Sequence, residues 1–329
     1  MNHIFGPVNS RRLGISLGID LLPPKICNFN CIYCEVGPTT TFTNLRGEYT
    51  ATAEIIAEID AYFADSAAVA RLDILTITAS GEPTLHSGLG KIIAHLKKIS
   101  NKPVAVLTNG SLLYLPEVRR ELAAADIVIP SLDAAREESY RRINRPAAEC
   151  DLPRLIGGLV DFSREFTGRC WLEILLARGI NDGPEDLAAL AAAVERIQPG
   201  RIQLNTVARP PLEAFALPLS LEELRAAAAS FKLPVDILSD HTVLDRRSEK
   251  ADSPGRQSEE EEIMHLLQRR PCPADDVASA LGIEPGRAEE ILDRLAGSHQ
   301  VTVSHHRGRD YYVITPNARG QKSDGRPPV

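Results

Sequence analysis

The sequence predicts an α/β protein, built as a partial (β/α)6 TIM-like barrel followed by a small winged helix-turn-helix domain. Two observations lead to this prediction. From about residue 15 to residue 240, short apolar runs alternate with longer segments of helical periodicity, which is the pattern of repeated βα units on a parallel sheet. Near residue 245 the alternation stops and a separate set of helical patterns follows.

The expected strands are short and apolar, and most are followed by a segment with apolar residues three or four positions apart. The strands are expected at 15–22, 72–78, 104–108, 126–130, 171–176 and 201–205, with a seventh candidate at 235–238. The helices are expected at 52–64, 89–99, 115–124, 152–166, 184–197 and 221–231. Right-handed crossovers curl a parallel sheet one way, so this even spacing favours a barrel. An open doubly wound sheet is the alternative.

The chain is expected to divide into four segments. Residues 1–244 form the barrel domain, and residues 245–258 are a polar stretch without apolar periodicity that indicates a linker. Residues 259–316 form the winged-helix domain, with helices at 259–268, 273–281 and 285–295 and a hairpin at 301–314. Residues 317–329 are expected to be a disordered polar tail.

Composition places the chain among ordinary globular proteins, because 43% of its 329 residues are hydrophobic and 25% are charged. No apolar run approaches the roughly 20 residues that cross a bilayer, and no basic region precedes an apolar stretch at the start. We therefore expect a cytoplasmic protein without a membrane partner. The formal charge of −7 gives no general attraction for nucleic acid, so such a partner would need a local patch.

Three of the six cysteines, Cys27, Cys31 and Cys34, follow a C-x3-C-x2-C spacing directly after an apolar strand. In a reducing compartment such clustering favours metal ligation over disulfides. One interpretation is a zinc site completed by a distant His or Cys. The other is a four-iron cluster that leaves one iron without a protein ligand.

This motif, with Tyr33 before the last cysteine, resembles the signature of the radical SAM superfamily, and the resemblance covers roughly residues 10 to 240. It implies a 4Fe-4S cluster held by Cys27, Cys31 and Cys34, whose open iron binds S-adenosylmethionine (SAM). It further implies that one electron cleaves SAM to methionine and a 5′-deoxyadenosyl radical, which abstracts hydrogen from a substrate. A low-potential electron donor such as flavodoxin or ferredoxin is the implied partner.

A second match follows the strand at 72–78, where Ser80-Gly81-Glu82-Pro83 resembles the GGEP motif of the family with Ser80 in place of the first glycine. The resemblance implies that Gly81, Glu82 and Pro83 hold the methionine amino group of SAM. The alternative is an ordinary turn at a strand end.

Further polar side chains lie at predicted strand ends, where barrels of this kind place their chemistry. Asn109, Ser131 and Asp133 resemble family positions that face the cofactor, and Tyr33 joins this cofactor-binding set. Weaker candidates for the same cavity are Glu173, Asn181, Gln203 and Asn205. A polar residue at a strand end is also commonly a simple cap or turn.

The segment 9–20 is similar to a single-cluster subgroup related to wybutosine-type tRNA-modifying enzymes and known broadly as iron-sulfur oxidoreductases. Arg11 and Arg12 within it fit either a bidentate site for a carboxylate or phosphate or a solvated pair. Cys150, Cys170 and Cys272 have no cysteine neighbour at a ligand spacing, which argues against a second cluster. Cys170 is expected to be buried core.

The expected winged domain is acidic, with eleven acidic and six basic side chains between residues 259 and 316. Acidic side chains on its third helix, including Glu289, Glu290 and Asp293, disfavour sequence-specific DNA binding. Only the wing at 305–309 is locally basic. A contact with protein or with an RNA backbone is therefore preferred.

Three functions remain open at this stage. The first is a radical SAM enzyme that modifies tRNA or another macromolecule, recruited by the C-terminal domain. The second is an activase-like enzyme that acts on a partner protein. The third, a redox-sensing DNA-binding regulator, leaves the long βα domain and the 80–83 turn without a purpose.

Overall fold

The computed structural model describes residues 3–10, 12–78, 80–238 and 258–315. The chain divides into two compact units, Met1–Arg246 and Arg247–Val329, and each is described by itself. The expected linker at 245–258, apart from Ser258, and the expected tail at 317–329 lie outside the described residues, as does Arg11.

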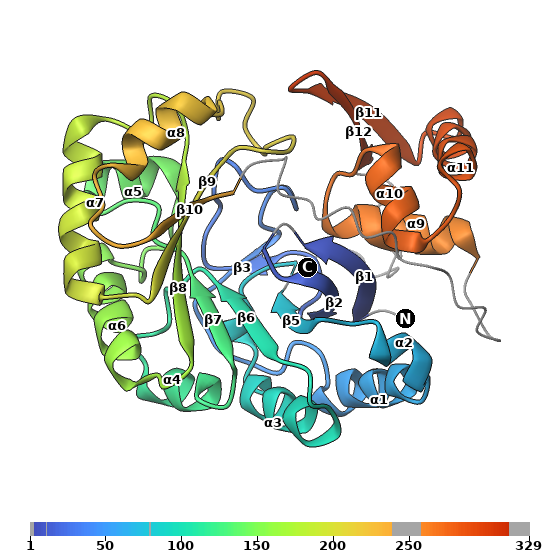
Figure 1. Ribbon diagram of the computed structural model, residues 1–329, viewed down its shortest axis with the longest axis horizontal. Helices are drawn as coiled ribbons and strands as arrows, with labels where there is room; N and C mark the ends of the chain where they lie inside the picture. Colours follow the sequence, from blue (N-terminus) through green and yellow to red (C-terminus); the bar gives the residue numbers. More distant parts are fainter. Residues whose placement is uncertain (1–2, 11, 79, 239–257, 316–329) are drawn as a thin grey trace, which may run out of the picture. The chain divides into compact units, whose positions relative to one another are not determined.

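The first unit is built on one eight-stranded sheet (Figure 1). Its strands, in their order across the sheet, are β1 (Ile4–Ser10), β2 (Gly14–Asp20), β5 (Ile74–Thr78), β6 (Val104–Thr108), β7 (Ile127–Pro130), β8 (Arg169–Leu176), β9 (Arg201–Thr206) and β10 (Val235–Ile237). Every pairing from β2 to β10 is parallel, and β1 pairs with β2 antiparallel.

The order of the parallel strands across the sheet is their order along the chain. A doubly wound sheet reverses its order at a switch point, and this sheet does not, so that alternative is wrong. Among the described residues β1 and β10 form two separate edges. The arrangement is that of a partial barrel, with β10 as the seventh parallel strand.

Helices cover the outer face of this sheet (Figure 1). They are α1 (Thr52–Phe63), α2 (Ser66–Ala70), α3 (Leu89–Ile99), α4 (Pro116–Leu122), α5 (Glu137–Ile143), α6 (Leu152–Glu165), α7 (Pro184–Ile197) and α8 (Leu221–Ala228). Helix α3 shows why they form: Leu89, Ile92, Ile93 and Leu96 recur at helical spacing and are all buried, so one stripe of the helix packs on the core.

The two faces of the sheet carry different clusters of side chains. On β6, Val104 and Val106 belong to the large core under the helices, whereas Ala105 belongs to a second, smaller cluster with Ile74 and Ile127. Because successive strand residues point to opposite faces, the small cluster lies inside the curve of the sheet. The interior of the barrel is therefore partly filled by apolar side chains.

Several elements were not expected from the sequence. Strand β1 escapes detection because Gly6 and Pro7 interrupt its alternation, and its register shifts between Phe5 and Val8. The strand expected at 15–22 ends at Asp20, whose carboxylate accepts a hydrogen bond from the Leu22 N–H at 3.2 Å and turns the chain. Other short elements show too little periodicity to be predicted, namely α2, α5, β3 (Ile26–Cys27), β4 (Thr41–Phe42) and the 3-10 helix η1 (Pro83–Leu85).

The second unit consists of three helices followed by a two-stranded antiparallel hairpin. Its elements are α9 (Glu259–Arg269), α10 (Ala274–Leu281), α11 (Pro285–Gly297), β11 (Val301–His306) and β12 (Arg309–Ile314). A capping box between Ser258 and Glu261 starts α9. Arg287 and Arg294 of α11 form ion pairs with Glu259 and Glu260 of α9.

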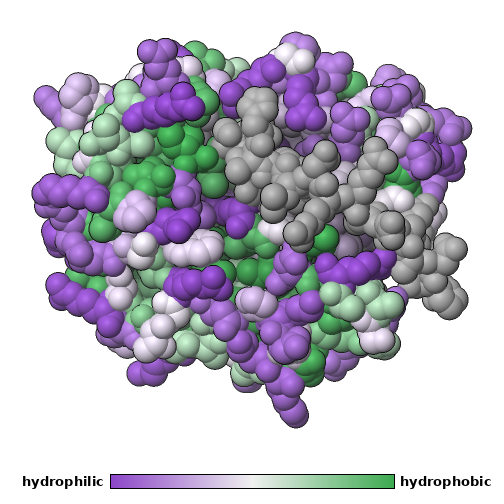
Figure 2. Space-filling view, viewed as in Figure 1, coloured by the Kyte–Doolittle hydropathy of each residue, from purple (hydrophilic) through white to green (hydrophobic). Residues whose placement is uncertain are grey.

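The surface is mostly hydrophilic on the face in Figure 2, with separate hydrophobic patches between the hydrophilic side chains. Within the described part of the chain, no helix has both the length and the apolar character needed to span a bilayer.

Candidate functional site

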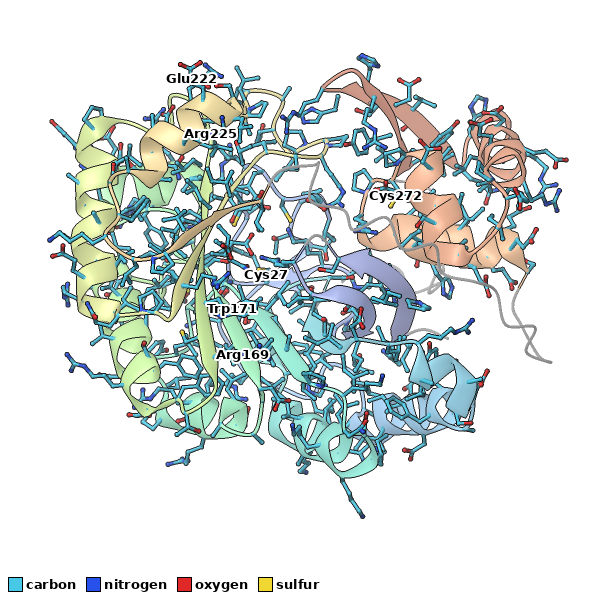
Figure 3. All side chains as sticks on the ribbon, in the orientation of Figure 1. Cys27, Arg169, Trp171, Glu222, Arg225 and Cys272 are labelled. Atoms are coloured by element: carbon cyan, nitrogen blue, oxygen red, sulfur yellow. The ribbon has the colours of Figure 1, made fainter. Side chains whose placement is uncertain are left out.

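The three clustered cysteines lie on the loop that begins at β3, next to the strand ends of the partial barrel. Cys27 is buried, and Cys31 and Cys34 are partly buried. A turn closed by the Cys34 N–H and the Cys31 carbonyl at 3.1 Å brings the last two together. Figure 3 shows Cys27 near the sheet, with Arg169 and Trp171 lower in the view at the start of β8.

Each of the three sulfurs receives an N–H donor. The Phe29 N–H reaches the Cys27 sulfur at 3.4 Å, the Asn144 amide reaches that of Cys31 at 3.5 Å, and Lys25 Nζ reaches that of Cys34 at 2.7 Å. Hydrogen bonds to sulfur are a feature of iron–sulfur ligation. This donor set therefore fits a cluster bound by three thiolates.

Burial favours the protonated form of the Cys27 and Cys31 thiols in the absence of metal. Burial raises the pKa of Cys31 to about 12, and nearby Asp133 and Cys34 add to the shift. Burial likewise raises the pKa of Cys27, against the lowering effect of Lys25. Since the thiolate is the ligand, binding a metal here must displace protons.

The described residues contain no group of three or more His, Cys, Asp or Glu side chains arranged to hold one metal ion. The cysteines of a four-iron cluster do not need that arrangement, because each binds a different iron. The geometry consequently offers no ready ligand set for the zinc interpretation within this part of the chain.

The turn after β5 packs directly against the cysteine strand. A Cβ on Gly81 would lie 1.7 Å from the Ile26 carbonyl oxygen, and the Glu82 N–H donates to that oxygen at 3.0 Å. Glycine is required at this close approach. The expected motif therefore lies beside Cys27, with Pro83 starting η1.

The Glu82 carboxylate is buried and accepts four hydrogen bonds. They come from the Thr84 N–H at 3.0 Å, the Thr84 and Thr108 hydroxyls at 2.6 Å each, and the Asn109 N–H at 2.6 Å. Burial raises its pKa, while these donors oppose the shift. Glu82 thus joins the turn after β5 to the end of β6.

Ser80 replaces the first glycine of the expected motif, and its side chain has a partner. The hydroxyl donates to Asp20 Oδ2 at 2.6 Å, and its N–H donates to Asp20 Oδ1 at 3.1 Å. Asp20 thereby holds the end of β2 to the turn after β5, a role that the sequence did not indicate.

Asp133 is the centre of a second buried group. It accepts from the Tyr33 hydroxyl at 2.5 Å, the Asn144 amide at 2.7 Å and the Leu175 N–H at 3.0 Å. Burial raises the pKa of Asp133 to about 6 despite these donors. The carboxylate therefore links the cysteine loop to α5 and β8.

Four expected cofactor-binding residues line one pocket, namely Tyr33, Asn109, Ser131 and Asp133. The rest of the lining is formed by Phe29, Leu132, Tyr140, Asn144 and Leu155. Its volume of about 10 Å³ is room for roughly one water molecule. A ligand of the size of SAM therefore requires the lining side chains to move. The lining carries hydroxyl, amide and carboxylate groups that can make hydrogen bonds to a polar ligand.

The weaker candidates divide between two places. Glu173, Gln203 and Asn205 meet Arg12: its guanidinium donates to Glu173 and, at 3.0 Å, to Gln203 Oε1, and the Asn205 amide donates to Glu173 at 3.3 Å. Arg12 is thus neither solvated nor free. Asn181 is fully buried and bonds to backbone carbonyls of Asp133 and Leu175, so it holds a loop and does not face a cavity.

Two residues whose side chains donate to the cysteine sulfurs were missed by the sequence analysis. Lys25 stands two positions before Cys27, where its charge was a signal that could have been used. Asn144 follows α5, which was itself not expected, so no signal pointed to it. Of the separate cysteines, Cys170 is buried in the core as expected.

Comparisons with known proteins agree with this geometry. The family model described as the Radical SAM superfamily matches residues 21–191. A UPF0026 protein of Helicobacter pylori is 34% identical over 94% of this chain and 96% of its own length. A protein of Brachyspira hyodysenteriae named GTPase Obg is 38% identical over 91% of this chain, which spans only 43% of that relative.

Among solved structures, a radical SAM methyltransferase from Sphaerobacter thermophilus superposes with a TM-score of 0.51 and 18% identity. The match covers 68% of this chain and 66% of that one. Streptococcus suis SuiB bound to S-adenosylmethionine gives a TM-score of 0.50 at 12% identity, over 71% of this chain and 54% of that one. At such identities these similarities concern the fold.

Proposed function

This chain belongs to the radical SAM superfamily and to the UPF0026 family, and from that premise we propose that it modifies a macromolecule by hydrogen abstraction. It is an enzyme, and its cofactors are a 4Fe-4S cluster and SAM. One observation supports the cofactor part of the proposal above others. Several groups meet at one edge of the sheet: three cysteine sulfurs that each accept an N–H hydrogen bond, the Gly81 turn, and the polar ends of β6 and β7.

When bound, the two cofactors supply the reductive cleavage of SAM to methionine and a 5′-deoxyadenosyl radical. Cys27, Cys31 and Cys34 would hold the cluster and leave one iron open. A low-potential donor such as flavodoxin or ferredoxin would provide the electron.

The SAM site is assigned to the groups around the cysteine loop. Gly81 and Pro83 would place the turn beside the methionine end, and Tyr33, Asn109, Ser131 and Asp133 would supply polar contacts. Because the Glu82 carboxylate already accepts four hydrogen bonds, we assign it to holding the strand ends in place. Arg12 and Glu173 face each other as a further polar pair.

The C-terminal unit is proposed to be a winged helix that recruits the substrate. Its three helices and hairpin support this assignment. The arginines of α11 are engaged by glutamates of α9, so they offer little to a DNA backbone. This favours tRNA, contacted through the wing, or a protein over DNA. Family membership also leaves the regulator interpretation without support.

The test is an anaerobic assay of the full chain reconstituted with iron and sulfide. After reduction and addition of SAM, 5′-deoxyadenosine should form, and its amount should rise with either bulk tRNA or a protein fraction. C31A should form none, whereas C170A, which removes a core thiol outside the site, should retain activity. Product from C31A, or an assembled cluster that never cleaves SAM with any fraction, would overturn the proposal.

A further inference from the structure

Lys25 places a buried positive charge against the cysteine loop. Lys25 is only 5% exposed. Its Nζ lies 2.7 Å from the Cys34 sulfur and 2.9 Å from the Gly37 carbonyl oxygen. A buried ammonium is costly unless an anion faces it. Cys34, as a cluster-bound thiolate, would be that anion, because it accepts the hydrogen bond from Lys25.

The other two sulfurs receive neutral donors. Cys27 is contacted by a backbone N–H and Cys31 by a side-chain amide. Among these three described donors, only the Lys25 ammonium at Cys34 carries a full charge. The asymmetry matters because a cation stabilises whichever redox state of a neighbouring group is more negative.

We propose that Lys25 is a positioning residue that raises the reduction potential of the cluster through its charged hydrogen bond to Cys34. The inference rests on the proposed function, because it presumes a cluster on these cysteines. The reduced cluster carries one more electron than the oxidised one, so the nearby ammonium favours reduction. Charge and hydrogen bonds to sulfur are known determinants of such potentials. Lys25 thereby brings the cluster within reach of its electron donor.

The experiment is a potentiometric titration of the reconstituted full-length protein, followed by electron paramagnetic resonance. K25M should lower the midpoint potential. At the wild-type midpoint, its ratio of reduced to oxidised cluster should fall about tenfold. K25R, which keeps the charge, should restore most of the wild-type value, and K25Q should lie between the two.

A matched control separates local from general charge. K97M also removes one positive charge, but Lys97 pairs with Asp126 just before β7, at the other end of the strands. Its midpoint should equal that of the wild type. SAM affinity, measured with oxidised cluster by equilibrium dialysis, should be unchanged in K25M.

Three results would overturn the inference: an unchanged midpoint in K25M, an equal shift in K97M, or a loss of SAM affinity without a shift in potential. If neither K25M nor K25Q holds a cluster while K25R does, Lys25 is needed for assembly and the inference is also wrong. Failure of the wild-type chain itself to form a reducible cluster would instead defeat the proposed function.

Discussion

Glu82 illustrates how a single carboxylate can organise a site without facing solvent. Its oxygens accept from Thr84, Thr108 and Asn109, which belong to two neighbouring strand ends. No neutral side chain of this length offers the same acceptors on both atoms. The residue therefore holds the turn after β5 to the end of β6, and in the proposed function it would support the cofactor site.

Replacing Glu82 with Gln should turn one acceptor into a donor that faces an N–H or hydroxyl. We expect a loss of about 2 kcal/mol in unfolding free energy, because a buried donor is left unpaired. SAM binding should weaken, while iron and sulfide content should stay at the wild-type level. E165Q, which alters an exposed partner of Arg119, serves as the control. Loss of the cluster in E82Q would contradict the assigned role.

Asp133 gives a prediction about pH. Burial raises its pKa to about 6, above the unfolded value of about 4. The stability it contributes is therefore fully present below the unfolded pKa and is lost as the pH rises through 6. Between about pH 5 and about pH 7, the cluster-free wild type should lose about 1 kcal/mol that D133N does not lose. Urea unfolding under anaerobic, reducing conditions measures this, and equal slopes for the two proteins would refute it.

At the scale of elements, the turn after β5 and the strand β3 fit together through backbone atoms. The Gly81 turn approaches Ile26 so closely that no side chain fits. This contact, together with the bond from the Glu82 N–H, sets the position of Cys27, which directly follows Ile26. A change that disrupts this contact should therefore lower both the cluster content and the stability of the fold.

Two glycine substitutions test this contact. G81A should destabilise the fold by about 3 kcal/mol or more and reduce cluster content, because the added Cβ meets a backbone oxygen at 1.7 Å. G157A in α6 meets nothing within 4 Å and should stabilise by up to about 1 kcal/mol, since alanine is the better helix former. Thermal unfolding and iron analysis measure both effects. A fully loaded, stable G81A would show that the turn can move freely.

For the whole molecule, the sequence predicts the parallel βα repeat and the three-helix and hairpin unit because both follow from periodicity. It also predicts the cysteines and the Gly81 turn because they form motifs. The contacts of Asp20 and Asn144 bring together distant segments, so no local pattern contains them. Lys25 differs, because it stands near the cysteines in the sequence and its charge was a usable signal. Asn181 was misjudged for the same reason: its place after a strand was visible, but its backbone partners were not.

The two compact units lead to a prediction about the division of labour. Every residue assigned to the cluster and to SAM lies within Met1–Arg246, whereas the proposed recruiting unit follows it. A chain ending at Arg246 should therefore assemble the cluster and cleave SAM without substrate at a rate close to that of the full chain. With the fraction that contains the substrate, its KM should rise about tenfold, which corresponds to losing about 1.4 kcal/mol of binding.

The comparison of the two chains distinguishes recruitment from catalysis. Recruitment alone changes KM and leaves kcat nearly constant, because the lost contacts are the same in the ground state and the transition state. A fall in kcat would instead place part of the C-terminal unit in the reaction itself. Equal KM values for the truncated and full-length chains would show that the unit serves another partner.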